Sequence, residues 1–176
     1  MNQKIILITV LIVIQSFVQA EPAKTVLNQE SFELSMINSQ HSNTNYSNGR
    51  GIFVGLSAPV YVTEYGITSL AIDGGYGNLG TIEGEDELGD PYSLRMGIVQ
   101  LGLRGTGMLT NHISAFAKAS IARVNADSTE LGKDINVEGQ LAAGLEWHLP
   151  KGLAFKLTYS QITDDVTSVM LGMSIR

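Results

Sequence analysis

Residues 138–149 read Glu-Gly-Gln-Leu-Ala-Ala-Gly-Leu-Glu-Trp-His-Leu, and successive side chains in this stretch fall alternately on two faces. One face carries Gly139, Leu141, Ala143, Leu145, Trp147 and Leu149. The other carries Glu138, Gln140, Ala142, Gly144, Glu146 and His148. The alternation lasts about a dozen residues, whereas an average strand has about five or six. The stretch therefore predicts an unusually long β-strand with one apolar face.

The same period of two returns at residues 153–159 and 167–175. We expect eight strands in all, at residues 31–39, 50–58, 65–77, 92–104, 112–124, 137–149, 152–163 and 167–176. The intervening segments alternate between long polar loops (40–49, 78–91 and 125–136) and short connections (59–64, 105–111 and 150–151), although Asp164-Asp165 is short where a long loop would fall. This arrangement is typical of an all-β fold, an eight-stranded antiparallel up-and-down transmembrane β-barrel, which residues 31–176 would form.

The first twenty residues have the pattern of a secretory signal peptide. Lys4 precedes an apolar run from Ile5 to Val18, and Val18-Gln19-Ala20 offers a cleavage site. The run is shorter than the ~20 apolar residues that a membrane-spanning helix needs, and an uncleaved anchoring helix is the alternative. We expect cleavage after Ala20, followed by a lead-in segment over residues 21–30.

The composition narrows the class of partner. The net charge of the 176 residues is −6, and it becomes −7 without the leader, which contains one lysine and no acidic residue. Nucleic acid is excluded as an expected partner because phosphate binding requires a basic face. The chain has no cysteine, so disulfides and thiolate metal sites are excluded as well. Charged residues make up 16% of the chain, below the quarter or so that is usual for a soluble domain.

The polar face of the strands decides which side points inward. A soluble ligand-binding barrel would place its apolar face inside and a charged face in water. Here the polar face is rich in Ala, Gly, Ser and Thr, which suit the crowded interior of a narrow barrel, while the opposite face carries leucines that suit lipid. Sparse charges share the inward face, and we predict that they form a paired network that plugs the lumen, because a buried charge is costly unless it is paired. Its members are Glu33, Asp73, Arg95, Lys118, Glu138, Glu146 and Lys156.

Aromatic residues gather near the ends of the expected strands. Amphipathic rings favour the interface between a membrane and water, so these residues predict an aromatic girdle. Its members are Tyr65, Tyr76, Tyr92, Trp147 and Tyr159.

Three segments resemble the small OmpA-like or opacity-type family of outer-membrane barrels. Ile113–Val124 is similar to the fifth strand of that family, Leu141–Tyr159 to its sixth and seventh strands, and Leu70–Gly77 to its third strand, in which Asp73 holds the place of an inward acid. The resemblance covers residues 65–176 clearly and 30–64 weakly, and it implies a barrel in the bacterial outer membrane. The closing strand of the family usually ends in Phe, whereas Gly172–Arg176 keeps the glycine and a hydrophobic residue without the Phe. We carry over no cell-wall tether, because the sequence contains no peptidoglycan-binding domain.

Catalytic and metal-binding motifs are weak in this sequence. His112-Ile113-Ser114 is similar to the His-x-Ser of a lipid A deacylase, but it falls beside a periplasmic turn and has no evident orienting carboxylate. Residues 83–90 hold five carboxylates whose spacing does not match an EF-hand, so we interpret them as a solvated acidic loop. We predict no catalytic, cofactor or metal site.

These expectations combine into one functional hypothesis. The chain is expected to be a plugged outer-membrane barrel with a structural or surface-interaction role, in contact with outer-membrane lipid and lipopolysaccharide. The loops at 40–49, 78–91 and 125–136 would meet an extracellular ligand. A minor channel for small ions or solutes, and a lipid A-modifying enzyme of the His-x-Ser kind, are the alternatives.

Overall fold

The computed structural model describes residues 27, 29–42, 47–63, 67–85, 91–128 and 132–176, and these form eight antiparallel strands. The strands are β1 (Ser31–His41), β2 (Gly49–Val62), β3 (Thr68–Glu85), β4 (Pro91–Met108), β5 (Ile113–Ser128), β6 (Gly132–His148), β7 (Leu153–Gln161) and β8 (Val166–Ile175). Each strand pairs with its sequence neighbours, and β1 also pairs with β8, so the sheet closes on itself. The predicted fold class, an eight-stranded antiparallel up-and-down β-barrel, is confirmed.

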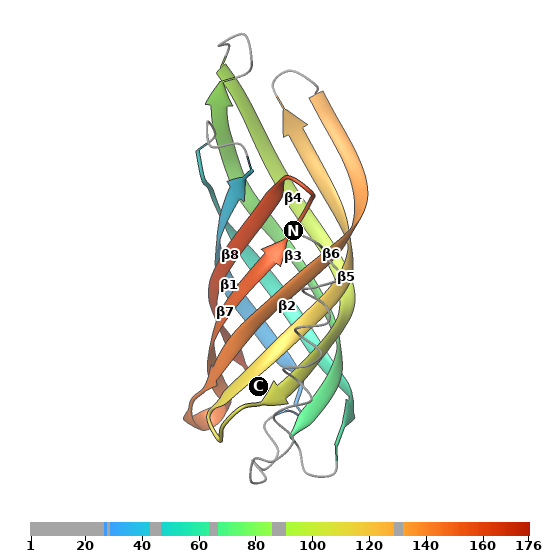
Figure 1. Ribbon diagram of the computed structural model, residues 1–176, viewed down its shortest axis with the longest axis vertical. Helices are drawn as coiled ribbons and strands as arrows, with labels where there is room; N and C mark the ends of the chain where they lie inside the picture. Colours follow the sequence, from blue (N-terminus) through green and yellow to red (C-terminus); the bar gives the residue numbers. More distant parts are fainter. Residues whose placement is uncertain (1–26, 28, 43–46, 64–66, 86–90, 129–131) are drawn as a thin grey trace.

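The barrel is tall and its strands are strongly tilted (Figure 1). One rim, here called the turn rim, carries the connections 63–67 and 109–112, the short helix η2 (Pro150–Gly152) and the end of β8. The opposite rim, here called the hairpin rim, carries the four remaining connections. The β3–β4 and β5–β6 hairpins rise beyond the others at this rim (Figure 1).

The strands of these two hairpins are longer than the sequence analysis predicts. Residues 78–85, 125–128 and 132–136 continue the ladders, although we expect them in loops. Their polar side chains hide the apolar alternation, but the backbone pairs of a ladder do not depend on side-chain polarity. The β3–β4 hairpin is also tied to the segment before β2, because Ser47 N donates to Glu83 O at 2.6 Å and Glu83 N donates to Ser47 Oγ at 2.9 Å.

A β-bulge between Asn78 and Gly80 changes which residues of β3 face inward. Before the bulge the odd-numbered residues Ala71 and Asp73 are buried in the interior, and after it the even-numbered Ile82 is buried. The bulge therefore changes the inward-facing residues of β3 from odd to even numbers. Gly80 has φ +86°, a left-handed conformation that favours glycine, and a Cβ at this position would overlap the backbone of Arg50. The bulge explains why the alternation in the sequence fades after residue 77.

The outer surface carries a continuous apolar belt. Nine large apolar residues expected on the outer face of the last three strands are exposed there: Leu141, Leu145, Leu153, Phe155, Leu157, Val169, Leu171, Met173 and Ile175. The expected inward residues Ala154, Thr158, Ser160 and Ser174 are buried. The molecule is therefore inverted relative to a soluble barrel, with apolar side chains outside and small or polar ones inside.

The expectations for the N-terminal part stay predictions. The signal peptide at 1–20 lies outside the described residues, as does most of the lead-in at 21–30, of which Leu27 is buried. No helix among the described residues is long and apolar enough to cross a membrane.

Candidate functional site

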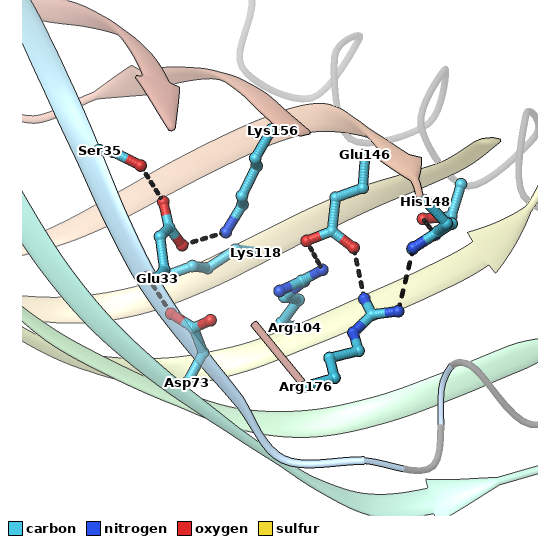
Figure 2. A network of polar contacts seen from close by, with 10 residues as sticks. Glu33, Ser35, Asp73, Arg104, Lys118, Glu146, His148, Lys156 and Arg176 are labelled. Atoms are coloured by element: carbon cyan, nitrogen blue, oxygen red, sulfur yellow. Dashed lines mark hydrogen bonds and ion pairs between the residues drawn. The ribbon is translucent and has the colours of Figure 1, made fainter. Parts of the chain in front are cut away.

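The most densely charged part of the interior is centred on Glu146 of β6, whose side chain is fully buried. Arg104 from β4 places Nη2 2.5 Å from Glu146 Oε1, and Arg176 after β8 donates from Nη2 to Glu146 Oε2 at 2.7 Å. Figure 2 shows the carboxylate between the two guanidinium groups. One carboxylate thus links three strands that lie around different parts of the barrel.

Two further ion pairs lie beside this centre (Figure 2). Lys156 of β7 donates to Glu33 Oε2, and Glu33 Oε1 also accepts a hydrogen bond from Ser35 Oγ at 2.6 Å. Lys118 of β5 pairs with Asp73 of β3. All four charged side chains are at most 9% exposed, so each pair is desolvated and mutually dependent.

The ring of Phe116 on β5 contacts two of the cations. Arg104 Cζ lies 4.5 Å from the ring centroid, and Lys156 Nζ lies 4.7 Å from it. Both distances are within the range of a cation–π interaction. Gly144, which pairs with Phe116 across β5 and β6, leaves the room for this ring, since a Cβ there would come within 2.6 Å of it.

Five of the seven predicted lumen charges take part in these ion pairs, namely Glu33, Asp73, Lys118, Glu146 and Lys156. The expectation for Arg95 is wrong, because this side chain is exposed on the outer face of β4. In β4 the alternation is regular, with Met96, Ile98 and Gln100 buried, and the β-bulge of the β3–β4 pair lies in β3. Glu138 faces inward but lies nearer the hairpin rim, where it forms no ion pair with a described residue.

The interior cations that the sequence analysis missed are Arg104 and Arg176. Both could have been found by parity, because each follows an outward apolar residue, Leu103 or Ile175, and must therefore point inward. Among the described residues of this cluster, three carboxylates face four cations.

The interior near the hairpin rim has a different character. Here buried apolar side chains from six strands and the β7–β8 connection pack together: Ile37, Phe53, Leu79, Ile82, Met96, Ile98, Ala122, Val124, Ile162, Val166 and Met170. We did not predict this cluster. Some of its residues, such as Phe53, lie between outward apolar neighbours, whereas others, such as Val124, lie between outward polar ones, so alternation gives no consistent signal for them.

An open vestibule of about 570 Å³ lies above this apolar cluster at the hairpin rim. Its apolar wall includes Met96 and Val124, and its polar wall includes Glu138, Asp164 and Asp165. The described residues contain no group of three or more His, Cys, Asp or Glu side chains that could hold a metal ion. The vestibule is therefore open at the hairpin rim and is closed on its inner side by the packed side chains of the apolar cluster.

Ser114 contacts a histidine, but not the one that the His-x-Ser motif suggests. Its Oγ lies 2.8 Å from Nε2 of His148, and both residues are buried, whereas His112 is exposed. Arg176 Nη1 lies 3.1 Å from His148 Nδ1. Because a guanidinium can only donate, Nδ1 must accept, which assigns the ring proton to Nε2 and makes Ser114 Oγ an acceptor from His148.

This polarity is opposite to that of a nucleophilic serine, whose hydroxyl must donate to an imidazole nitrogen. Ser114 is also fully buried, so lipid cannot reach it in this arrangement. The Ser114–His148 pair therefore fits a structural role at the turn rim.

The predicted girdle residues divide into described and undescribed ones. Tyr76, Trp147 and Tyr159 are exposed on the outer surface. Tyr65 lies outside the described residues, and for Tyr92 only the backbone is described, in β4 opposite Gly84. Tyr61, which we did not predict, is exposed near the turn-rim end of β2, as Trp147 is near that end of β6.

Comparisons with known proteins show a similarity of fold alone. Neither a protein-family model nor a curated protein sequence matches this chain. Among solved structures, the N-terminal β-barrel domain of Pseudomonas aeruginosa OprF is similar, with a TM-score of 0.55, 13% identity, and coverage of 84% of this chain and 98% of that domain. The attachment invasion locus protein Ail of Yersinia pestis is similar with a TM-score of 0.52 and 12% identity, and the match covers 83% of this chain and 95% of Ail. A de novo designed transmembrane β-barrel is similar with a TM-score of 0.50 and 13% identity, and the match covers 82% of this chain and 93% of the designed one.

These neighbours establish the architecture of small outer-membrane barrels for this chain. At such low identity they carry no residue-level correspondence.

Proposed function

We propose that this protein is a small outer-membrane β-barrel with a structural or surface-interaction role and a lumen plugged by its own side chains. The observation that carries the proposal is the inverted barrel, in which an apolar belt surrounds an interior of paired charges. An eight-stranded barrel is only wide enough for side chains to fill.

The apolar belt supports placement in a membrane. Large apolar side chains such as Leu56, Leu101 and Leu171 are more than half exposed, which a soluble surface rarely shows over such a contiguous area. In lipid this exposure is favourable, and closure of the barrel satisfies the backbone groups of every strand within the belt.

The interior supports a closed state. The ion pairs around Glu146 occupy the turn-rim half, and the apolar cluster around Phe53 and Ile98 occupies the hairpin-rim half. A conducting path would have to open both layers, so we expect the barrel to act as a rigid support and not as a pore.

The hairpin rim is the part that would meet other molecules. The segments 40–49, 78–91 and 125–136, predicted as ligand-binding loops, coincide with the extended β3–β4 and β5–β6 hairpins and the β1–β2 connection (Figure 1). The Yersinia pestis protein Ail, a neighbour in fold, has been solved with the heparin analogue sucrose octasulfate. A sulfated polysaccharide is therefore a reasonable first probe for this rim.

Cell fractionation tests the location. We expect the full chain, expressed in a Gram-negative host, to appear in the outer-membrane fraction and to migrate differently in electrophoresis with and without boiling. A soluble periplasmic protein would overturn the proposal.

Planar-bilayer recording tests the plug. We expect pure protein to give no sustained openings. Steady, voltage-stable openings would show that the lumen conducts and would favour the channel alternative.

Shortened hairpins test the interaction role. A variant with β3–β4 and β5–β6 cut back to the level of the other hairpins should insert normally and lose binding to its surface ligand. Equal binding by both forms would place recognition elsewhere.

A further inference from the structure

The two edges of the apolar belt differ in charge. On β2 the exposed outward residues run from Leu56 through Val54 and Ile52 to Arg50 at the hairpin side. On β5 the exposed Ile121 is followed at the next outward position by Arg123.

On β4, too, the outward apolar residues end at an arginine. On β4 the outward series runs from Leu101 and Val99 through Gly97 to Arg95. An arginine therefore closes the belt on three strands, always at the edge towards the hairpin rim. At the turn rim, the one outward cation among the described side chains is Lys151, which lies in η2 and not on a strand.

The three arginines lie in one sector of the barrel. Gly80 lies directly beside the backbone of Arg50 and pairs with Met96, the neighbour of Arg95. Arg50 and Arg95 are thus two strands apart, about 10 Å at the usual spacing of a sheet. Arg123 pairs with Val99, four residues along β4 from Arg95.

These arginines differ from the interior cations in whether they form ion pairs with carboxylates. Arg104, Lys118, Lys156 and Arg176 each contact a buried carboxylate. Arg50, Arg95 and Arg123 are exposed, and none of them forms an ion pair with another described residue.

Carboxylates on this side lie nearer the hairpin rim than Arg50 and Arg123 do. Asp127 is four residues further along β5 than Arg123, although it is directly opposite Arg95. Glu83 is two residues beyond Thr81, the partner of Arg95. The charges nearest the apolar belt are therefore positive, and Arg50 and Arg123 have the least competition from carboxylates.

We propose that Arg50, Arg95 and Arg123 form a binding site for the phosphate groups of lipid A in the outer leaflet. A guanidinium matches a phosphate in a bidentate fashion, and a ligand whose acyl chains lie on Ile52, Val99 and Ile121 would present its phosphates at the height of the arginines. The site deepens the proposed function and rests on it, because it requires that the hairpin rim faces the outer leaflet.

The test compares lipid binding by the wild-type protein and the triple variant R50Q/R95Q/R123Q. Native mass spectrometry from detergent micelles would measure half-occupancy concentrations for bisphosphorylated lipid A, dephosphorylated lipid A and phosphatidylglycerol. We expect the wild type to prefer bisphosphorylated lipid A and the triple variant to bind it roughly 100-fold more weakly, at about fivefold per arginine near an anionic surface. The matched control Lys151→Gln, at the opposite rim, should bind as the wild type does.

Each outcome decides a separate claim. Equal binding of lipid A with and without phosphates, equal binding by the triple variant, or a preference for phosphatidylglycerol would overturn the lipid A site. In each of these cases the proteins would still show heat-modifiable migration in the outer-membrane fraction. Absence of that migration in the wild type would instead overturn the outer-membrane proposal. Single variants Arg50→Gln and Arg123→Gln remove one charge each and keep the test valid if the triple variant does not fold.

Discussion

The two halves of the lumen are built from different chemistry inside the same cylinder. The turn-rim half is held by charge, with Glu146 between Arg104 and Arg176. The hairpin-rim half is held by packing, with Phe53, Ile98 and their neighbours in a buried apolar cluster. The outer surface over both halves includes exposed apolar residues, so this contrast between charge and packing belongs to the interior.

This difference shows how a narrow barrel specifies its interior. Ion pairs fix particular partners at particular positions, because each buried charge is costly without its counterpart. Apolar packing tolerates alternatives of similar volume more readily. The charged half should therefore depend on individual residues more strongly than the apolar half.

The largest effect is expected at the centre of the charged half. Glu146→Gln keeps the shape of the side chain but leaves Arg104 and Arg176 buried without their carboxylate. We expect the free energy of unfolding, measured by urea denaturation in lipid vesicles, to fall by about 3 to 5 kcal/mol, as for other broken buried pairs.

Glu138→Gln is the matched control on the same strand and the same face. Glu138 lines the open vestibule and forms no ion pair with a described residue, so its substitution should change the free energy of unfolding by less than about 0.5 kcal/mol. Equal effects of the two substitutions would remove the distinction between the charged centre and the rim.

The sequence predicts the charged half better than the apolar half for a physical reason. In the charged half, inward polar residues alternate with outward leucines, so Glu146 and Lys156 could be assigned to the lumen by parity. In the apolar half the inward residues are hydrophobic, so polarity does not distinguish them from outward apolar residues such as Ile52 and Val99. The bulge before Gly80 also shifts the parity of Ile82, so the sequence predicts neither the cluster nor the length of β3.

Which charged residues pair with one another in the turn-rim half depends on the register of the strands, which the sequence does not reveal. Lys156 and Glu33 are far apart in the sequence and meet because β7, β8 and β1 are successive strands of the closed sheet. Parity could have placed Arg104 and Arg176 inside, but it could not have shown that both contact Glu146. The contact of Ser114 with His148, instead of the neighbouring His112, also arises from the pairing of β5 with β6.

Ile98→Ala tests the apolar half. Ile98 is almost completely buried, so its truncation should leave a cavity and lower the free energy of unfolding by about 2 to 5 kcal/mol. Ile98→Val, measured in the same way, should cost only about 0.5 to 1.5 kcal/mol. A graded response indicates packing, whereas equal losses for both variants would indicate that cavity size is not what matters.

Ser114→Ala is expected to have a smaller effect. It removes the hydroxyl that accepts from His148, and we expect a loss of about 1 kcal/mol in the free energy of unfolding, as for one neutral hydrogen bond. Mass spectra of lipid A from cells that express the wild type or the variant should be identical. A difference in acyl chains would contradict the assigned polarity of the Ser114–His148 pair and favour the enzyme alternative.

The smallest effect is expected at Arg95, the residue that sequence analysis placed in the lumen. Its side chain is exposed on the outer face of β4, so Arg95→Gln should change the free energy of unfolding in micelles free of lipid A by less than about 0.5 kcal/mol. Arg104→Gln on the same strand removes a cation that contacts Glu146 and Phe116 and should cost several times more. The reverse order would mean that β4 faces the other way, because a shift of one residue in register exchanges the two faces of a strand.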